Sequence, residues 1–149
     1  NSLNVVPVSI SYEKDPNDIL KAKELYLTDL NQEYIKDRKE DMESIFEGII
    51  GQKGDVHLSI GNIINFESDS YDDCSNLITN AIKDSYKLHA TNYAAAIIQG
   101  IDAPKNSFDI DKIDLAIESI EEKLNLIPEE MHKYLLKQYS NPLEINERQ

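Results

Sequence analysis

The three histidines, His57, His89 and His132, are the first residues to test for chemistry, because imidazole acts both as a general base and as a metal ligand. None of them stands four residues from another, and none lies beside a cysteine or aspartate cluster with metal-ligand spacing. His57 alternates with Val56 and Leu58, so we expect it to face either solvent or a cleft. The histidines therefore predict no metal site.

The other reactive groups favour structural roles. Cys74 is the single cysteine, which excludes an intrachain disulfide framework and a multi-thiolate metal site and fits a reducing compartment. Acidic pairs such as Asp72-Asp73 lie at predicted helix starts or on polar faces, where they favour the helix dipole or stay solvated. The chain has no GxGxxG, no Gly-Lys-Ser/Thr phosphate loop and no GxSxG. From the residues alone we predict no catalytic group and no cofactor.

Composition narrows the class of protein. At 149 residues and 40% hydrophobic content, the chain is long enough for one domain with its own core. Its net charge of −13, from 28 acidic and 15 basic residues, would repel nucleic acid and anionic membranes. No apolar run approaches the roughly 20 residues of a spanning helix, and the first residues lack a signal-peptide pattern. We expect a protein that is soluble or at most peripheral to a membrane.

The first part of the chain, residues 1–66, predicts strands and helices in alternation. VVPVSISYE, from Val5 to Glu13, is typical of a strand buried on both faces. Such a strand needs neighbours, so we expect this chain to be the downstream part of a larger protein. A helix from about residue 19 to 29 and a second helix with one apolar face, closed by Gly51, follow. Val56, Leu58 and Ile60 then alternate with polar residues, as in a half-buried strand.

The remaining part, residues 67–143, predicts helices only. Asp72 and Asp73 are placed to cap a helix over 77–86, and Thr91-Asn92 to cap one that ends at Gly100. Apolar residues at spacings of three and four predict an amphipathic helix over 110–127, which Pro128 separates from a last helix. Tyr139-Ser140-Asn141-Pro142 is expected to end that helix, leaving 144–149 as a tail. The predicted fold class is α/β: a helix-rich fragment with two or three strands of a larger mixed sheet, then a helical half.

Four segments in order resemble bacterial glycerolipid acyltransferases, the family of 1-acylglycerol-3-phosphate and glycerol-3-phosphate acyltransferases. VVPVSISYE followed by Asp-Pro resembles the family's fourth conserved block. GIIGQKGDVH, residues 48–57, is similar to its helix end, Lys-Gly turn and Val-His strand. YKLHATNY, residues 86–93, resembles its Tyr-x-Leu-x-Pro-Thr-Asn segment, and YSNP, residues 139–142, its closing Tyr-Ala-Asn-Pro. The match spans nearly the whole chain, with departures at Asn17, Ile63 and Ala90.

The resemblance implies chemistry that this chain does not carry. The family uses an HxxxxD motif, whose histidine takes the proton of the glycerol hydroxyl as it attacks an acyl thioester. The residues five positions after the three histidines are Asn62, Ala94 and Lys137, so the motif is absent. The general base, the phosphate clamp and the thioester site would all lie upstream.

The implied function is a supporting one. The parent would transfer a fatty acyl group from acyl-CoA or acyl carrier protein to glycerol-3-phosphate or a lysophospholipid, in the cytoplasm or at the inner face of the membrane. The implied substrate-lining residues are Val6, Pro7, Val8 and Ser9, with Tyr12, Glu13 and Asp15 at the end of the strand. An ordinary core strand is the alternative for these residues.

Two further expectations concern partners. If the gene product is this short, the chain would be a non-enzymatic module that binds a partner through apolar helix faces. A strand without its upstream neighbours would also pair edges or bury Val5, Val8 and Ile10 against another copy. We therefore expect the isolated chain to self-associate.

Overall fold

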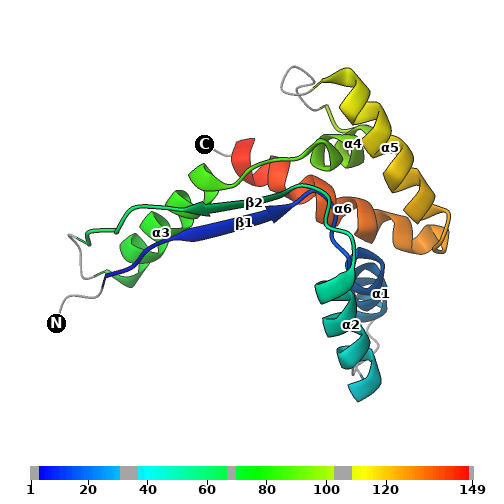
Figure 1. Ribbon diagram of the computed structural model, residues 1–149, viewed down its shortest axis with the longest axis horizontal. Helices are drawn as coiled ribbons and strands as arrows, with labels where there is room; N and C mark the ends of the chain where they lie inside the picture. The colour runs from blue at the N-terminus through cyan, green and yellow to red at the C-terminus, as the bar shows by residue number, and fades with distance from the viewer. Residues whose placement is uncertain (1–3, 31–36, 67–69, 103–108, 148–149) are drawn as a thin grey trace.

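The computed structural model describes residues 4–30, 37–66, 70–102 and 109–147. Within these residues a two-stranded antiparallel sheet and six helices occur (Figure 1). Their order is β1 (Val8–Tyr12), α1 (Asp18–Asp29), α2 (Arg38–Ile50), β2 (Val56–Ile60), α3 (Tyr71–Ser85), α4 (Ala90–Ile98), α5 (Ile110–Leu124) and α6 (Glu129–Glu147). The predicted mixture of helices and strands is confirmed, and most of the described chain is helical. None of these helices is both long and apolar enough to cross a membrane.

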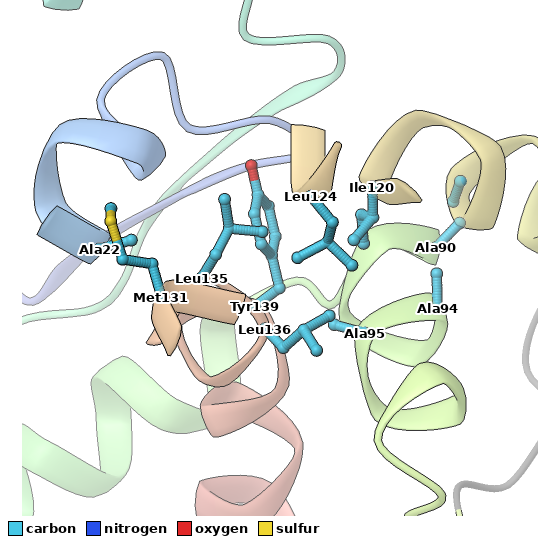
Figure 2. Packing of buried hydrophobic residues seen from close by; sticks show 11 residues of the cluster. Ala22, Ala90, Ala94, Ala95, Ile120, Leu124, Met131, Leu135, Leu136 and Tyr139 are labelled. Carbon is cyan, nitrogen blue, oxygen red and sulfur yellow. The ribbon is translucent and has the colours of Figure 1, made fainter. Parts of the chain in front are cut away.

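The core lies where α1, α4, α5 and α6 meet (Figure 2). Alanines on α4 and α1 are fully enclosed, and their small side chains let the larger residues of α5 and α6 approach closely. The predicted apolar stripe of α5 is confirmed from Ile113 to Leu124, whereas Ile110 is 70% exposed and the helix ends at Leu124, before the predicted residue 127. The buried residues of this cluster include Ala22, Ala94, Ala95, Ile120, Leu124, Met131, Leu135, Leu136 and Tyr139.

Two helix starts differ from the sequence prediction. Ser70, and not Asp72 or Asp73, is the N-cap of α3, where its Oγ accepts a hydrogen bond from the backbone N–H of Asp73 at 3.4 Å. Helix α4 begins at Ala90, one residue before the predicted Thr91-Asn92 cap. Asn92 instead lies inside the first turn and accepts a hydrogen bond from the backbone N–H of His89 at 2.6 Å. Several residues near each helix start have side chains that could serve as the N-cap, so the sequence alone does not identify which of them does.

The prediction that Pro142 ends the last helix is wrong. Helix α6 contains Pro142 and continues to Glu147, so most of the predicted tail is helical. Proline removes one backbone N–H donor, which normally favours a helix end. Here Leu143, just beyond it, is buried against Tyr93 and Ala96. Burial of this leucine offsets the cost of the proline, because the helix must continue for that contact to form.

The β1–β2 ribbon has its polar face inside and its apolar face outside. Ser9 and Ser11 are 3% and 2% exposed, whereas the neighbouring Val8, Ile10 and Tyr12 are 51%, 47% and 38% exposed. The apolar residues pair across the two strands, Val8 with Ile60, Ile10 with Leu58 and Tyr12 with Val56. The prediction that β1 is buried on both faces is therefore wrong for the residues described.

Strand β2 follows the same arrangement. Its alternation is confirmed, but Val56, Leu58 and Ile60 are the more exposed residues, at 50%, 58% and 69%. The reason is that the end of α3 and the start of α4 contact the serine side of the ribbon, where Ser9 Oγ donates to the backbone oxygen of Ser85 at 3.0 Å. Within the described residues the apolar side stays open to solvent.

Helix α2 also presents its apolar face to solvent. The predicted helix is confirmed, but the expectation that its apolar side packs is wrong for the residues described, because each of its five large apolar residues is more than half exposed: Met42, Ile45, Phe46, Ile49 and Ile50. On its polar side, Glu40 forms an ion pair with Lys23 of α1 at 3.4 Å. Gly51 ends the helix where a Cβ would lie 2.4 Å from Pro16 Cβ, so only glycine fits this approach.

Candidate functional site

The predicted substrate-lining residues are divided between the two faces of the ribbon. Val6, Val8 and Tyr12 lie on the exposed apolar face, whereas Pro7 and Ser9 are buried. Glu13 is turned toward β2, where its carboxylate accepts a hydrogen bond from the backbone N–H of Asp55 at 2.9 Å. These residues therefore form no single pocket, and the exposed ones form part of an open apolar surface.

A serine and a histidine meet on the buried face of the ribbon. Ser11 Oγ lies 3.1 Å from His89 Nε2, a distance compatible with a nucleophile and its base. The two residues are only 2% and 4% exposed, so a substrate cannot reach the hydroxyl. Burial, followed by the nearby Lys87 charge, lowers the pKa of His89. We assign the pair a structural role that ties β1 to the start of α4 with a neutral imidazole.

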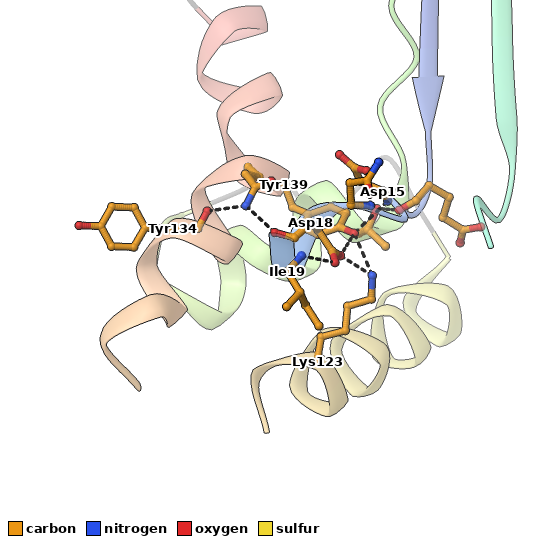
Figure 3. A network of polar contacts seen from close by, with 10 residues as sticks. Asp15, Asp18, Ile19, Lys123, Tyr134 and Tyr139 are labelled. Atoms are coloured by element: carbon orange, nitrogen blue, oxygen red, sulfur yellow. Dashed lines mark hydrogen bonds and ion pairs between the residues drawn. The ribbon is translucent and has the colours of Figure 1, made fainter. Parts of the chain in front are cut away.

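The most extensive polar cluster surrounds Asp18, at the start of α1 (Figure 3). Asp18 is 2% exposed, and its Oδ2 accepts hydrogen bonds from Tyr139 Oη at 2.6 Å and from Lys123 Nζ. Its Oδ1 accepts from the backbone N–H of Ile19 at 2.7 Å. The ion pair with Lys123 joins α1 to α5, and the hydrogen bond from Tyr139 joins α1 to α6, so removal of either partner would leave a buried charge poorly paired.

Tyr139 extends this cluster to the end of β1. Its Oη accepts a hydrogen bond from the backbone N–H of Asp15 at 3.0 Å and lies 3.3 Å from Lys123 Nζ. Burial first, and then the negative charge of Asp18, raises the pKa of Tyr139 far above its usual value of 10.0. The phenol therefore stays protonated near neutral pH and serves as a structural donor, not as an acid or base.

Sequence reasoning did not find this cluster. Asp18 lies 105 residues before Lys123 and 121 residues before Tyr139. In the sequence Asp18 is one more acidic residue at a helix start, and no local pattern couples it to the other two. The one indication of this cluster in the sequence was Tyr139, which belongs to one of the four segments that resemble the acyltransferase family.

Those four segments contact one another in the fold. Residues 5–13 include strand β1, and the end of the segment 48–57 pairs with it through Val56 with Tyr12 and His57 with Ser11. Thr91 Oγ1 donates to the backbone oxygen of Glu13 at 2.6 Å, and Asn92 Nδ2 donates to the backbone oxygen of Tyr139 at 2.8 Å. The third segment therefore bridges the first and the fourth.

The arrangement offers no metal centre among the residues that the structure describes, since no three His, Cys, Asp or Glu side chains are grouped to hold an ion. Comparisons give no further assignment: no family model, no curated protein and no solved structure matches the chain.

Proposed function

We propose that the chain is the C-terminal part of a glycerolipid acyltransferase. The whole protein would move a fatty acyl group from acyl-CoA or acyl carrier protein to glycerol-3-phosphate or a lysophospholipid, working in the cytoplasm or at the inner face of the membrane. The HxxxxD motif would belong to the preceding part, so this chain alone would be inactive. The observation that carries the proposal is the direct bonding among the four segments that resemble the family.

This bonding matters because the segments are distant in sequence. Thr91 Oγ1 reaches the backbone of Glu13 across 78 residues, and Asn92 Nδ2 reaches the backbone of Tyr139 across 47. Short motifs that resembled a family by chance would have no reason to share one hydrogen-bonded unit. Their convergence supports one functional module.

The exposed ribbon face supports the same proposal. Val8, Ile10 and Tyr12 present apolar side chains that gain free energy when covered, about 1 kcal/mol for each half-exposed aliphatic residue. Glu13 N donates to the backbone oxygen of Asp55, and Gly61 N donates to that of Pro7. By antiparallel alternation, the backbone groups of the even-numbered β1 residues therefore point to the other edge of the strand. Both features are those of a strand that adds to a larger mixed sheet.

In this proposal the chain positions the reaction and does not perform it. Val6 and Val8 would form an apolar wall near the acyl chain, where exclusion of water strengthens the electrostatic interactions of the catalytic groups. The Asp18–Lys123–Tyr139 cluster would hold the helices behind that wall. No proton transfer is assigned to His89 or Tyr139, because each is buried and already bonded.

The test is acyl transfer by the product of the complete reading frame. Labelled acyl-CoA and lysophosphatidate are the substrates, and the matched variant replaces the histidine of the HxxxxD motif with alanine. The proposal predicts transfer that this substitution abolishes. Transfer that survives the substitution would refute the mechanism, and a complete reading frame without an HxxxxD motif would refute the assignment.

Helix α2 favours a second candidate, a non-enzymatic interaction module. Its apolar face is as open as that of the ribbon, with Ile49 72% exposed, and a partner helix would cover such a stripe through residues spaced three and four apart. Ile49→Asp would abolish partner binding in this candidate. In the acyltransferase proposal, transfer depends on the ribbon instead.

A further inference from the structure

A groove with a cavity volume of about 600 Å³ lies between α1, the end of α4 and α6. Its lining includes Leu25 and Asp29 of α1, Gln99 after α4, and Lys133, Lys137 and Asn141 of α6. The volume falls within the range of small-ligand sites. The groove is separate from the ribbon, but it adjoins the Asp18 cluster, because the lining residue Gln138 donates from Nε2 to the backbone oxygen of Asp18 at 3.2 Å.

The charges in this groove have the opposite sign to the rest of the protein. Lys133 and Lys137 are one helical turn apart, and Asp29 is the carboxylate among the described residues that line the groove. Lys133 Nζ lies 3.5 Å from Asp29 Oδ2. Lys137 has no hydrogen bond or ion pair with any residue in the described ranges. The groove therefore has a local excess of one positive charge in a chain of net charge −13.

This local excess of positive charge would attract an anion that enters the groove. Charges separated by more than about 8 Å are largely screened at physiological ionic strength, so carboxylates beyond that distance contribute little. Glu130 lies one turn before Lys133 on α6 and reduces the excess there, which leaves Lys137 as the main contact for an anion. Two lysines four residues apart on a helix also repel each other, which an anion between them would relieve. Lysine ammonium groups bind phosphate oxygens without the planar geometry that arginine requires.

The rest of the lining would contact an apolar group. Leu25 and the ring of Tyr134 lie in the groove beside the lysines. The ring is fixed in place, because Tyr134 Oη donates to Asp29 Oδ2 at 2.5 Å and its edge packs against Tyr26 with ring centroids 5.9 Å apart. We propose that this groove binds a small phosphate monoester, with the phosphate held by Lys137 and Lys133 and the organic group against Tyr134.

The experiment is a titration of the full chain followed by amide NMR shifts at constant 0.15 M ionic strength. The probes are phenyl phosphate, inorganic phosphate and benzoate, and the variants are Lys137→Gln and, as a control of equal charge change, the exposed Lys112→Gln on α5. Phenyl phosphate should shift amides of α1 and α6 around the groove and bind more tightly than inorganic phosphate. Lys137→Gln should weaken it about fivefold, as for one exposed charge pair, and Lys112→Gln less than twofold.

Three results would show that the groove is not a phosphate site. These are no saturable shift up to about 10 mM phenyl phosphate, equal weakening by the two variants, and binding of benzoate as tight as that of phenyl phosphate. If inorganic phosphate binds as tightly as the ester, the ligand is free phosphate and the assignment to a monoester is wrong.

Discussion

Replacing Tyr139 by phenylalanine tests the buried polar cluster while keeping the ring in the core. The change removes the hydroxyl that donates to Asp18 Oδ2 at 2.6 Å and accepts from the Asp15 N–H at 3.0 Å. Loss of one hydrogen bond to a charged group costs about 1.5 to 3 kcal/mol, and a backbone donor left without a partner costs about 1 kcal/mol or more. We expect the free energy of unfolding to fall by about 3 kcal/mol.

Urea denaturation followed by circular dichroism measures this loss. With a denaturant dependence of about 2 kcal/mol/M, the midpoint should fall by about 1.5 M. The matched control is Tyr134→Phe, which removes a hydroxyl from the same helix and also from a carboxylate, that of Asp29, but at an exposed site. Its effect should be much smaller, because solvent replaces the lost donor. Equal midpoints for the two variants would refute the structural role assigned to the Asp18 cluster.

Three other predictions concern stability and association. Burial lowers the pKa of His89 below its usual 6.5, so the unfolded chain binds more protons than the folded chain as the pH falls through that value. The free energy of unfolding should therefore be constant above about pH 6.5 and decrease below it, as measured by melting curves at several pH values. A flat profile between pH 5 and 7 would contradict this. Leu135→Ala, at a fully enclosed position, should cost about 3 kcal/mol in denaturation experiments, whereas Leu126→Ala, at a position 73% exposed, should cost less than about 0.5 kcal/mol. In sedimentation velocity experiments the isolated chain should self-associate, and Ile10→Asp should shift it to a monomer. A wild-type chain that is strictly monomeric would show that the ribbon face does not drive association.

The sequence predicted best the elements whose pattern is local. The helix that became α5 carries isoleucines at regular spacings of three and four, and this spacing places them on one face whatever the rest of the chain does. The end of α4, two residues before Gly100, was equally predictable, since the φ of 72° at Gly100 favours glycine after a helix. The error at Pro142 arose because a distant contact of Leu143 outweighs the local preference of proline.

The ribbon shows where local pattern stops being informative. The alternation of apolar and polar residues identified the two faces of β2 correctly. It cannot show which face is buried, because burial depends on which helices pack against the ribbon. Here α3 and α4 bury Ser9 and Ser11, whose hydroxyls find partners in Ser85 and His89. The Asp18 cluster was equally hidden, because its members meet only after α1, α5 and α6 have packed.

The proposal that the β1–β2 ribbon belongs to an acyltransferase is tested most directly by comparing acyl transfer by the complete protein with and without Val8→Asp. Val8 is half exposed in this chain, so the substitution should leave the stability of the isolated chain nearly unchanged. In the proposed complete protein it would place a charge on the apolar face of the ribbon, which the rest of the enzyme would cover. We predict that transfer to lysophosphatidate is lost with Val8→Asp and retained with Lys112→Gln, whereas unchanged transfer in the Val8→Asp protein would contradict the account.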